Sequence, residues 1–190
     1  KYRKAIFERK RMKFEEAQKS FTDLGTITQW QFCGVFENLN GSGLEIEYEP
    51  EIYAKNDKLF DANSNGKIGW YNPKDVENDG YQFFTNEGEY GNGIIYAQTF
   101  IDSPEKKSFL LRFGASQGLK VFLNDKEIYF NQDIKRTNLD AYTLKIDLEK
   151  GLNRLLFKLS TSGGSDYFSA QVKNLDTTIA NDLKFSNKYL

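Results

Sequence analysis

The sequence predicts an all-β fold, an antiparallel jelly-roll-like β-sandwich preceded by one amphipathic α-helix. After Gly25, apolar and polar residues alternate with a period of two, as they do along strands with one buried face. The alternating stretches are short and are separated by Asn, Asp and Gly residues that favour turns. Between them the sequence shows no helical pattern of the kind that connects parallel strands. A chain of 190 residues with 15% aromatic residues also supplies the apolar surface that a core requires.

The first 24 residues carry the helical pattern. Phe7, Phe14 and Phe21 recur every seven residues, and Ala17 and Leu24 fall on the same side. Gly25 then provides a C-terminal cap, because glycine adopts the left-handed conformation that ends many helices. The apolar stripe could dock a partner helix, or it could pack on the sandwich or on helices upstream. We favour the packing interpretation.

The strand pattern begins at Thr26–Phe36, where Trp30, Phe32 and Phe36 share one predicted face and Cys33 points to the other. We therefore expect Trp30 and Phe32 in the core and Cys33 as a small buried side chain. Further strands are predicted at Leu44–Tyr48, Lys67–Tyr71, Tyr81–Thr85, Ile94–Ile101, Ser108–Phe113, Leu119–Leu123, Glu127–Phe130, Tyr142–Leu148, Asn153–Leu159 and Tyr167–Val172. Between two of them, Asn124-Asp125 predicts a two-residue hairpin, because Asn and Asp tolerate the positive φ angles of such turns.

These patterns divide the chain into three parts. Residues 1–25 form an amphipathic helix, expected to be the end of an upstream helical region. Residues 26–172 form the β-sandwich domain, and residues 173–190 form a C-terminal tail, a short helix or the start of a linker. The piece is therefore expected to belong to a larger protein, with neighbouring domains of the same polypeptide as its partners.

Composition excludes several kinds of chemistry. The sequence contains no histidine and one cysteine, which rules out Ser–His–Asp and Cys–His catalysis and zinc sites built from His or Cys within this chain. The first 20 residues carry eight Lys or Arg against three Glu, whereas the remainder has an excess of acidic residues. An acidic sandwich repels phosphate, so we expect no nucleic-acid partner. No apolar run approaches the roughly 18 residues that cross a bilayer, so no membrane span is predicted.

Two acidic patterns in the sequence are candidate sites. Asp61, Asn63 and Asn65 match the first half of a calcium-binding EF-hand loop, but Asn72 stands where the bidentate Glu should be. We therefore interpret the loop as a polar turn and expect no cofactor. Glu45, Glu47, Glu49 and Glu51 are spaced two residues apart, and if the strand is regular through Glu49 three of them lie on one face. Such a row is more typical of a solvated edge than of the opposed carboxyl pair of a glycosidase. We predict that the chain is not an enzyme.

Aromatic residues gather in the middle of the chain among Asn, Asp, Glu and Gly. Flat aromatic faces can stack on sugar rings, and neighbouring polar side chains can bind hydroxyl groups, although in a sandwich such aromatics often fill the core. If a ligand binds, we expect it at these candidate residues: Trp70, Tyr71, Tyr81, Asn86, Glu89 and Tyr90.

Several motifs carry a family resemblance. The run Phe109–Asp125 is similar to the strand, small-residue corner, strand and Asn-Asp turn of galactose-binding-like and protective-antigen-like jelly rolls. Leu148–Lys158 resembles the L-x-x-G-x-N-x-L-x-x-K strand of the same families, and Trp30–Asn38 resembles their W-x-x-x-G-x-F-x-N opening. The likeness covers about residues 28–172. The corner at Ala115–Gly118 lacks the paired Asp of the protective-antigen-like pattern, so a carbohydrate site does not carry over there.

The order of motifs also resembles the N-terminal domain of bacterial envelope proteins that carry helical repeats and a transglutaminase-like domain. That resemblance implies a non-catalytic accessory or structural module in an extracytoplasmic protein, in the periplasm or at the cell surface. The alternative is a carbohydrate-binding module that uses the aromatic loop surface.

Overall fold

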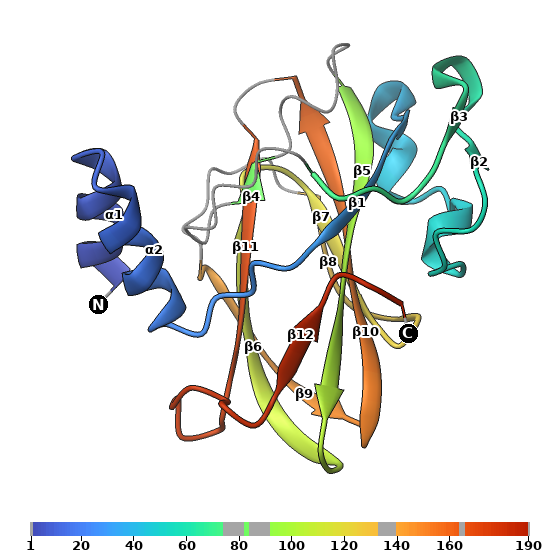
Figure 1. Cartoon of the computed structure of the whole chain (residues 1–190). Helices are drawn as coiled ribbons and strands as arrows, with labels where there is room; N and C mark the ends of the chain where they lie inside the picture. The colour runs from blue at the N-terminus through green and yellow to red at the C-terminus, as the bar shows by residue number, and fades with distance from the viewer. Residues whose placement is uncertain (1, 74–81, 84–91, 133–139, 164–165, 190) are drawn as a thin grey trace.

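The computed structural model is a β-sandwich with an N-terminal helical hairpin (Figure 1). It describes residues 2–73, 82–83, 92–132, 140–163 and 166–189. Two antiparallel sheets face each other, as the sequence predicts. The first sheet has the order β1 (Gln31–Glu37), β5 (Asn92–Ser103), β10 (Gly151–Ser162), β7 (Leu119–Leu123) and β8 (Lys126–Asn131), with β12 (Lys184–Ser186) also paired to β5. The second has the order β4 (Gln82–Phe83), β11 (Tyr167–Lys173), β6 (Lys107–Ala115) and β9 (Tyr142–Leu148).

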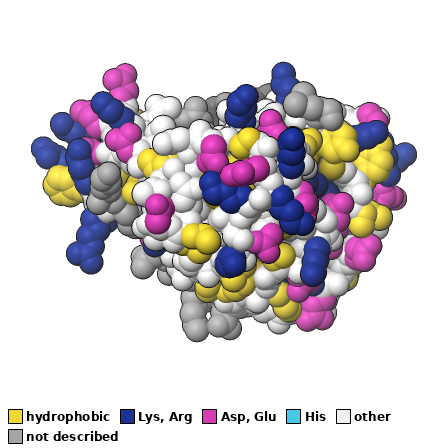
Figure 2. All heavy atoms as spheres, turned by 90° about the horizontal axis from the view of Figure 1, so that it is seen from below, with side chains coloured by type: hydrophobic (Ala, Val, Ile, Leu, Met, Phe, Trp, Pro, Cys, Tyr) yellow, Lys and Arg dark blue, Asp and Glu magenta, His cyan; other side chains and the backbone are white. Residues whose placement is uncertain are grey.

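The N-terminal region is helical, but it forms two helices, α1 (Tyr2–Lys10) and α2 (Phe14–Thr22). The chain turns at Met12, whose φ of 59° is left-handed and cannot continue a helix. Because the turn separates the three phenylalanines, the prediction of one continuous apolar stripe is wrong: Phe21 is buried, whereas Phe7 and Phe14 are exposed. Lys and Arg side chains gather at this end of the molecule, with Asp and Glu side chains among them (Figure 2).

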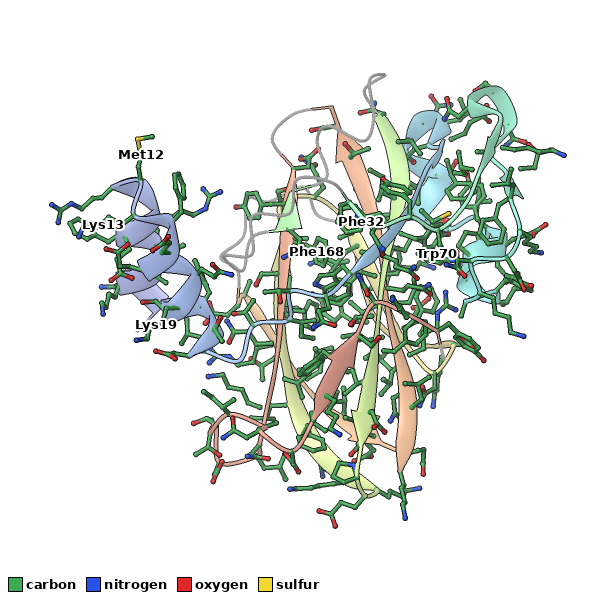
Figure 3. All side chains as sticks on the ribbon, viewed as in Figure 1. Met12, Lys13, Lys19, Phe32, Trp70 and Phe168 are labelled. Atoms are coloured by element: carbon green, nitrogen blue, oxygen red, sulfur yellow. The ribbon has the colours of Figure 1, made fainter. Side chains whose placement is uncertain are left out.

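The main core lies between the two sheets. Trp30 packs edge-on against Phe157 and Phe168, with ring centroids 5.5 and 4.9 Å apart, and its indole N–H donates to the Ile27 carbonyl at 3.0 Å. Phe32 and Phe168 meet in the same layer (Figure 3). The prediction that Trp30 and Phe32 belong to the core is confirmed.

A bulge in β1 changes which face the side chains after Gly34 occupy. The pairing of β1 with β5 shifts between Gly34 and Phe36, so one extra residue enters the strand. Phe36 therefore lies on the outer face with Cys33, and the prediction that it shares a face with Trp30 and Phe32 is wrong. Cys33 is fully buried, as predicted.

The outer face of the first sheet is covered by residues 38–72, which we call the cover segment. It has little regular structure: the 3₁₀ helices η1 (Leu39–Leu44), η2 (Glu49–Glu51) and η3 (Asn63–Asn65), and the short strands β2 (Phe60–Asp61) and β3 (Lys67–Ile68). The predicted strand at Leu44–Tyr48 is absent, because Leu44 ends a 3₁₀ turn and Tyr48 folds back to donate its hydroxyl to the Glu37 carbonyl. A second apolar cluster lies between the cover segment and the sheet, and Phe60 and Trp70 are the contribution of the cover segment to it.

Two further segments complete the sandwich. Asn124 and Asp125 have φ angles of 50° and 63°, so the predicted two-residue hairpin between β7 and β8 is confirmed. In the C-terminal segment, β12 pairs with β5, and Ala180 and Leu183 are buried in the main core. None of the described helices is long and apolar enough to cross a membrane. The domain boundaries themselves remain a prediction.

Candidate binding pocket and the polar network beneath it

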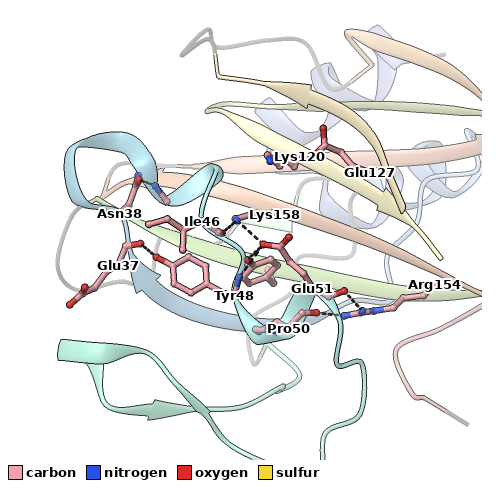
Figure 4. A network of polar contacts seen from close by, with 12 residues as sticks. Glu37, Asn38, Ile46, Tyr48, Pro50, Glu51, Lys120, Glu127, Arg154 and Lys158 are labelled. Atoms are coloured by element: carbon pink, nitrogen blue, oxygen red, sulfur yellow. Dashed lines mark hydrogen bonds and ion pairs between the residues drawn. The ribbon is translucent and has the colours of Figure 1, made fainter. Parts of the chain in front are cut away.

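Polar side chains on the outer face of the first sheet hold the cover segment in place (Figure 4). Lys158 on β10 donates to the Ile46 carbonyl, and Arg154 on the same strand donates to the carbonyls of Pro50 and Glu51. On β5, the Gln98 amide donates to the Ala54 carbonyl at 2.9 Å. The carbonyls of this irregular segment that face the sheet are not paired within a helix or sheet, so these side chains supply the donors.

One end of this network is a buried ion pair. Lys158 Nζ lies 2.7 Å from Glu51 Oε1, and the lysine side chain is 1% exposed. The hydroxyl of Tyr96 donates to the same oxygen at 2.6 Å. Burial lowers the pKa of Lys158, and the hydrogen bond and charge of Glu51 oppose that effect. The pair therefore anchors the cover segment through Glu51.

Arg154 occupies the other end. Its Nε donates to Gln98 at 2.9 Å, one terminal nitrogen lies 2.9 Å from the Asp125 carboxylate, and its guanidinium lies over the Trp70 ring at 5.7 Å. Burial lowers the pKa of this guanidinium, and Asp125 opposes the shift. Arg154 thus links the network to the β7–β8 turn at the surface.

A pocket of about 370 Å³ opens beside Arg154. It lies where five parts of the chain meet: the cover segment after η2, β5, the β7–β8 turn, the start of β10 and the C-terminal segment. Phe100 is buried at its base, and Tyr189 packs edge-on against Phe100 with centroids 5.4 Å apart. The pocket therefore has an aromatic wall supported by the sheet.

The rim of the pocket combines apolar and charged groups. Ile52, Leu152 and Tyr189 are exposed apolar side chains, and Tyr189 is 47% exposed. Lys55 lies over the Tyr189 ring at 5.9 Å, and the exposed carboxylate of Asp125 stands by Arg154. These groups offer apolar contact, a cationic donor and an anionic acceptor within one cavity.

The candidate residues from the sequence lie elsewhere. Trp70 is buried on the inner side of the cover segment, where its N–H donates to the Tyr53 carbonyl at 3.1 Å. Tyr71 is half-buried and packs edge-on against Phe32. Both rings contribute to the apolar clusters on the two sides of the first sheet, and a ligand-binding role for these two residues stays a prediction. Four candidates lie outside the described residues: Tyr81, Asn86, Glu89 and Tyr90.

The loop that contains Asp61, Asn63 and Asn65 is hydrogen-bonded to the end of β1. Asp61 accepts a hydrogen bond from the Asn63 N–H at 2.9 Å, and the Asn65 amide donates to the Val35 carbonyl at 2.9 Å. The hydroxyl and backbone N–H of Ser64 both donate to Glu37, and these bonds lower the pKa of the Glu37 carboxyl. Across the described residues, no three Asp, Glu, Cys or His side chains gather as metal ligands. These hydrogen bonds hold residues 61–65 as a turn against the end of β1.

The run from Glu45 to Glu51 does not form the solvated strand face expected from the sequence. Glu51 points inward to Lys158, whereas Glu49 is exposed and pairs with Lys58 at 2.6 Å. The 3₁₀ turn at Glu49–Glu51 breaks the period of two, so the residues point in different directions.

The sequence interpretation missed Lys55, Asp125, Arg154 and Tyr189. A signal for the network was present in β10, where Arg154 and Lys158 interrupt an apolar strand at positions that face the same side. Two charges on one face of a strand that is otherwise apolar indicate buried polar partners. The residues next to Tyr189 in the sequence give no signal of a binding site. Tyr189 lies at the pocket because β12 pairs with β5 and places the C-terminal segment beside it.

Comparison with known proteins gives partial structural matches. No protein-family model matches the chain, and no curated protein matches it. A β-glucosidase from Kluyveromyces marxianus is similar over 76% of this chain, with 12% identity and a TM-score of 0.48, and the chain spans 16% of that enzyme's length. A family 35 carbohydrate-binding module from an environmental isolate is similar over 50% of this chain and 70% of its own, with 15% identity and a TM-score of 0.34. The PA14 domain of the MpAFP antifreeze protein is similar over 54% of this chain and 58% of its own, with 14% identity and a TM-score of 0.39.

Proposed function

We propose that this chain is a non-catalytic accessory module of a larger extracytoplasmic bacterial protein, and that its pocket beside Arg154 binds a saccharide. The observation that carries the proposal is the pocket of about 370 Å³ itself, in which Arg154 is fixed by the sheet and the rim combines apolar side chains with charged groups. Binding sites for small ligands combine an apolar lining with a few placed polar groups in this way.

The chemistry of a sugar fits this lining. A pyranose ring has apolar C–H faces and hydroxyl groups around its edge. Tyr189, Ile52 and Leu152 provide surfaces for the C–H face, while Asp125 can accept from hydroxyl groups and Lys55 can donate to them. With charges of both signs at the rim, the pocket suits a polar ligand in which donors and acceptors alternate.

The pocket supports binding more than hydrolysis. Glycoside hydrolysis in most families uses two carboxyl groups on either side of the scissile bond. Among the described lining residues, Asp125 is the one carboxylate, and it is paired with Arg154. A module that holds a saccharide without cleaving it would position neighbouring domains of the same polypeptide at a polysaccharide surface.

The test is a glycan array followed by calorimetric titration of the saccharides that bind. We expect Tyr189→Ala to weaken binding by about tenfold, since loss of a stacking ring removes roughly 1 kcal/mol or more. Asp125→Asn should also weaken binding while preserving the turn, because Asn tolerates the positive φ at this position.

Phe130→Ala is the matched control. Phe130 is an exposed aromatic residue on β8 that does not line the pocket, so its loss should leave affinity unchanged. Equal losses in Tyr189→Ala and Phe130→Ala would show that the pocket is not the site. No binding to any saccharide would overturn the binding role and leave a purely structural module.

A further inference from the structure

The charges that line the pocket beside Arg154 do not cancel. Among the described lining residues, Lys55, Asp125 and Arg154 carry a charge. The terminal nitrogens of Arg154 donate to the carbonyls of Pro50 and Glu51 (Figure 4), and one of them is also paired with Asp125 at 2.9 Å. Arg154 and Asp125 therefore balance each other, and the ammonium group of Lys55 is the charge that remains.

Lys55 forms no ion pair with the described carboxylates. Its side chain is exposed, and its ammonium group lies 5.9 Å from the centroid of the Tyr189 ring. A cation over a tyrosine ring at an exposed site is held weakly. The ammonium group can therefore leave the ring and pair with an anionic group of a ligand.

The acidic residues around the pocket face groups other than Lys55. Glu51 is paired with Lys158 at 2.7 Å, and Asp57 accepts a hydrogen bond from the Tyr53 hydroxyl at 2.6 Å. Asp102 is exposed on β5 and lies in register with a lysine of β12. The described part of the pocket therefore keeps a cationic rim, although the chain as a whole has a net charge of −1.

The position of this cation matters because Tyr189 is the aromatic wall of the pocket. A pyranose ring held against Tyr189 carries its substituents around its edge, within reach of the lysine that lies by the same tyrosine. A hydroxyl group would leave the ammonium charge unbalanced. A carboxylate or a sulfate would form a charge-assisted hydrogen bond with it, which is stronger than a neutral one.

We propose that the pocket selects saccharides that carry an anionic substituent, a carboxylate or a sulfate, and that Lys55 determines this selection. The inference rests on the proposed function, because it names the class of saccharide for the same pocket. Arg154 is not the selecting residue, since Asp125 already balances its charge.

The test compares sugars that differ in one substituent. Methyl glucoside, methyl glucuronide and the sulfate ester of methyl glucoside at its primary hydroxyl are titrated calorimetrically into the full chain, with the matching galactose and mannose series in parallel. In a series that binds, we expect an anionic member to bind at least about tenfold more tightly than the neutral member at low salt. The difference should shrink as salt is added, because exposed charges are screened. The tighter of the two anionic members identifies the substituent.

Substitutions at position 55 test the role of the lysine. Lys55→Gln should lower affinity for the anionic sugar to that of the neutral one, and it should change the neutral affinity less than about twofold. Lys55→Arg should keep the preference. Lys126→Gln is the matched control, because Lys126 is an exposed lysine next to Asp125 that does not line the pocket. It should change the ratio of the two affinities less than about twofold.

The outcomes separate this inference from the proposed function. Equal affinity for the neutral and anionic members of every series that binds would overturn the selection and leave the saccharide site in place. A preference that survives in Lys55→Gln, or that falls equally in Lys126→Gln, would overturn the role of Lys55. Failure of the proposed function appears instead as the absence of any saccharide ligand on the glycan array, and that result would overturn both.

Discussion

Lys158 is a single buried residue that holds the cover segment on the sheet. It lies on a strand buried on both faces, so its ammonium group cannot reach bulk water. Glu51 and the Ile46 carbonyl take the place of water, and the rings of Tyr48 and Tyr96 lie 5.3 and 5.6 Å from Nζ. A buried charge is tolerated when such partners are in place, and removing one partner leaves the other desolvated and alone.

Lys158→Met should therefore destabilise the protein by about 3–5 kcal/mol, because Glu51 keeps its charge in a buried site. Urea denaturation measures the change. Glu127→Gln is the control: it breaks the more exposed pair with Lys120, at 3.2 Å, and should cost less than about 1 kcal/mol. A loss in Lys158→Met no larger than in this control would contradict the anchoring role. Adding Glu51→Gln to Lys158→Met should recover part of the loss.

Asp166 is a second buried acidic residue that organises its surroundings. Its carboxylate accepts hydrogen bonds from Ser116, Gln117, Thr161 and the Ser162 backbone N–H, at 2.9 to 3.1 Å. Burial acts to raise the pKa of Asp166, but these hydrogen bonds outweigh burial and lower it. Asp166 thus joins the corner at Ala115–Gly118 to the connection between β10 and β11.

The lowered pKa of Asp166 gives a pH dependence of defined sign. The folded protein holds this proton less tightly than the unfolded chain, so the contribution to stability is present above about pH 4 and declines as the pH falls further. Denaturation at pH 7 and pH 3.5 should show a smaller difference for Asp166→Asn than for the unaltered protein. Asp102→Asn, at an exposed site on β5, should leave the difference unchanged. The same pH response in all three proteins would count against this assignment.

At the scale of elements, the cover segment is stabilised by its contacts with the sheet more than by its own secondary structure. Its carbonyls at Ile46, Pro50, Glu51 and Ala54 are all satisfied by side chains from β5 and β10. Beneath it lies Cys33, whose thiol has a pKa raised by burial. The thiol can react only when the cover segment moves away or the whole protein unfolds.

Labelling of Cys33 should therefore report opening of the cover segment. We expect slow reaction with a thiol reagent in the native protein and at least about tenfold faster reaction in Gln98→Ala, which frees the Ala54 carbonyl. The free energy of unfolding of each variant, measured in parallel, separates local opening of the cover segment from global unfolding. Phe130→Ala, at an exposed site of the same sheet, is the control and should leave the labelling rate unchanged. Rapid labelling of the unaltered protein would show that Cys33 is not covered in solution.

At the scale of the molecule, the C-terminal segment belongs to the sandwich and also completes the pocket. β12 continues the first sheet beside β5, at positions that β1 does not reach. Leu183 enters the main core, and Tyr189 then forms the pocket wall against Phe100. Folding of the tail and formation of the pocket are therefore coupled.

Leu183→Ala should cost about 2–5 kcal/mol, because it removes a core side chain that is 7% exposed. Leu175→Ala is a matched change in the same segment at a site that is 52% exposed, and it should cost less than about 0.5 kcal/mol. Thermal and urea denaturation of the two variants provide the measurement. Equal, small effects would show that residues after Lys173 behave as a linker.

Local patterns in the sequence determined much of the sandwich. Strands such as β6, β7 and β9 were predicted within a few residues, because alternation and turn residues are properties of short windows. The Asn124-Asp125 turn and the burial of Trp30 follow from the same local chemistry. The absence of histidine excluded whole classes of catalysis without any structural information.

Tertiary structure decided the features that depend on segments distant in sequence. The bulge changes which face the side chains after Gly34 occupy only because β5 imposes its register, and the cover segment is held by donors on β5 and β10. The pocket joins Lys55, Phe100, Arg154 and Tyr189, which no window of the sequence contains together. Periodicity shows that one face of a strand is buried, but it does not say what covers the other face. That contact is made by another part of the chain, and only folding brings the two together.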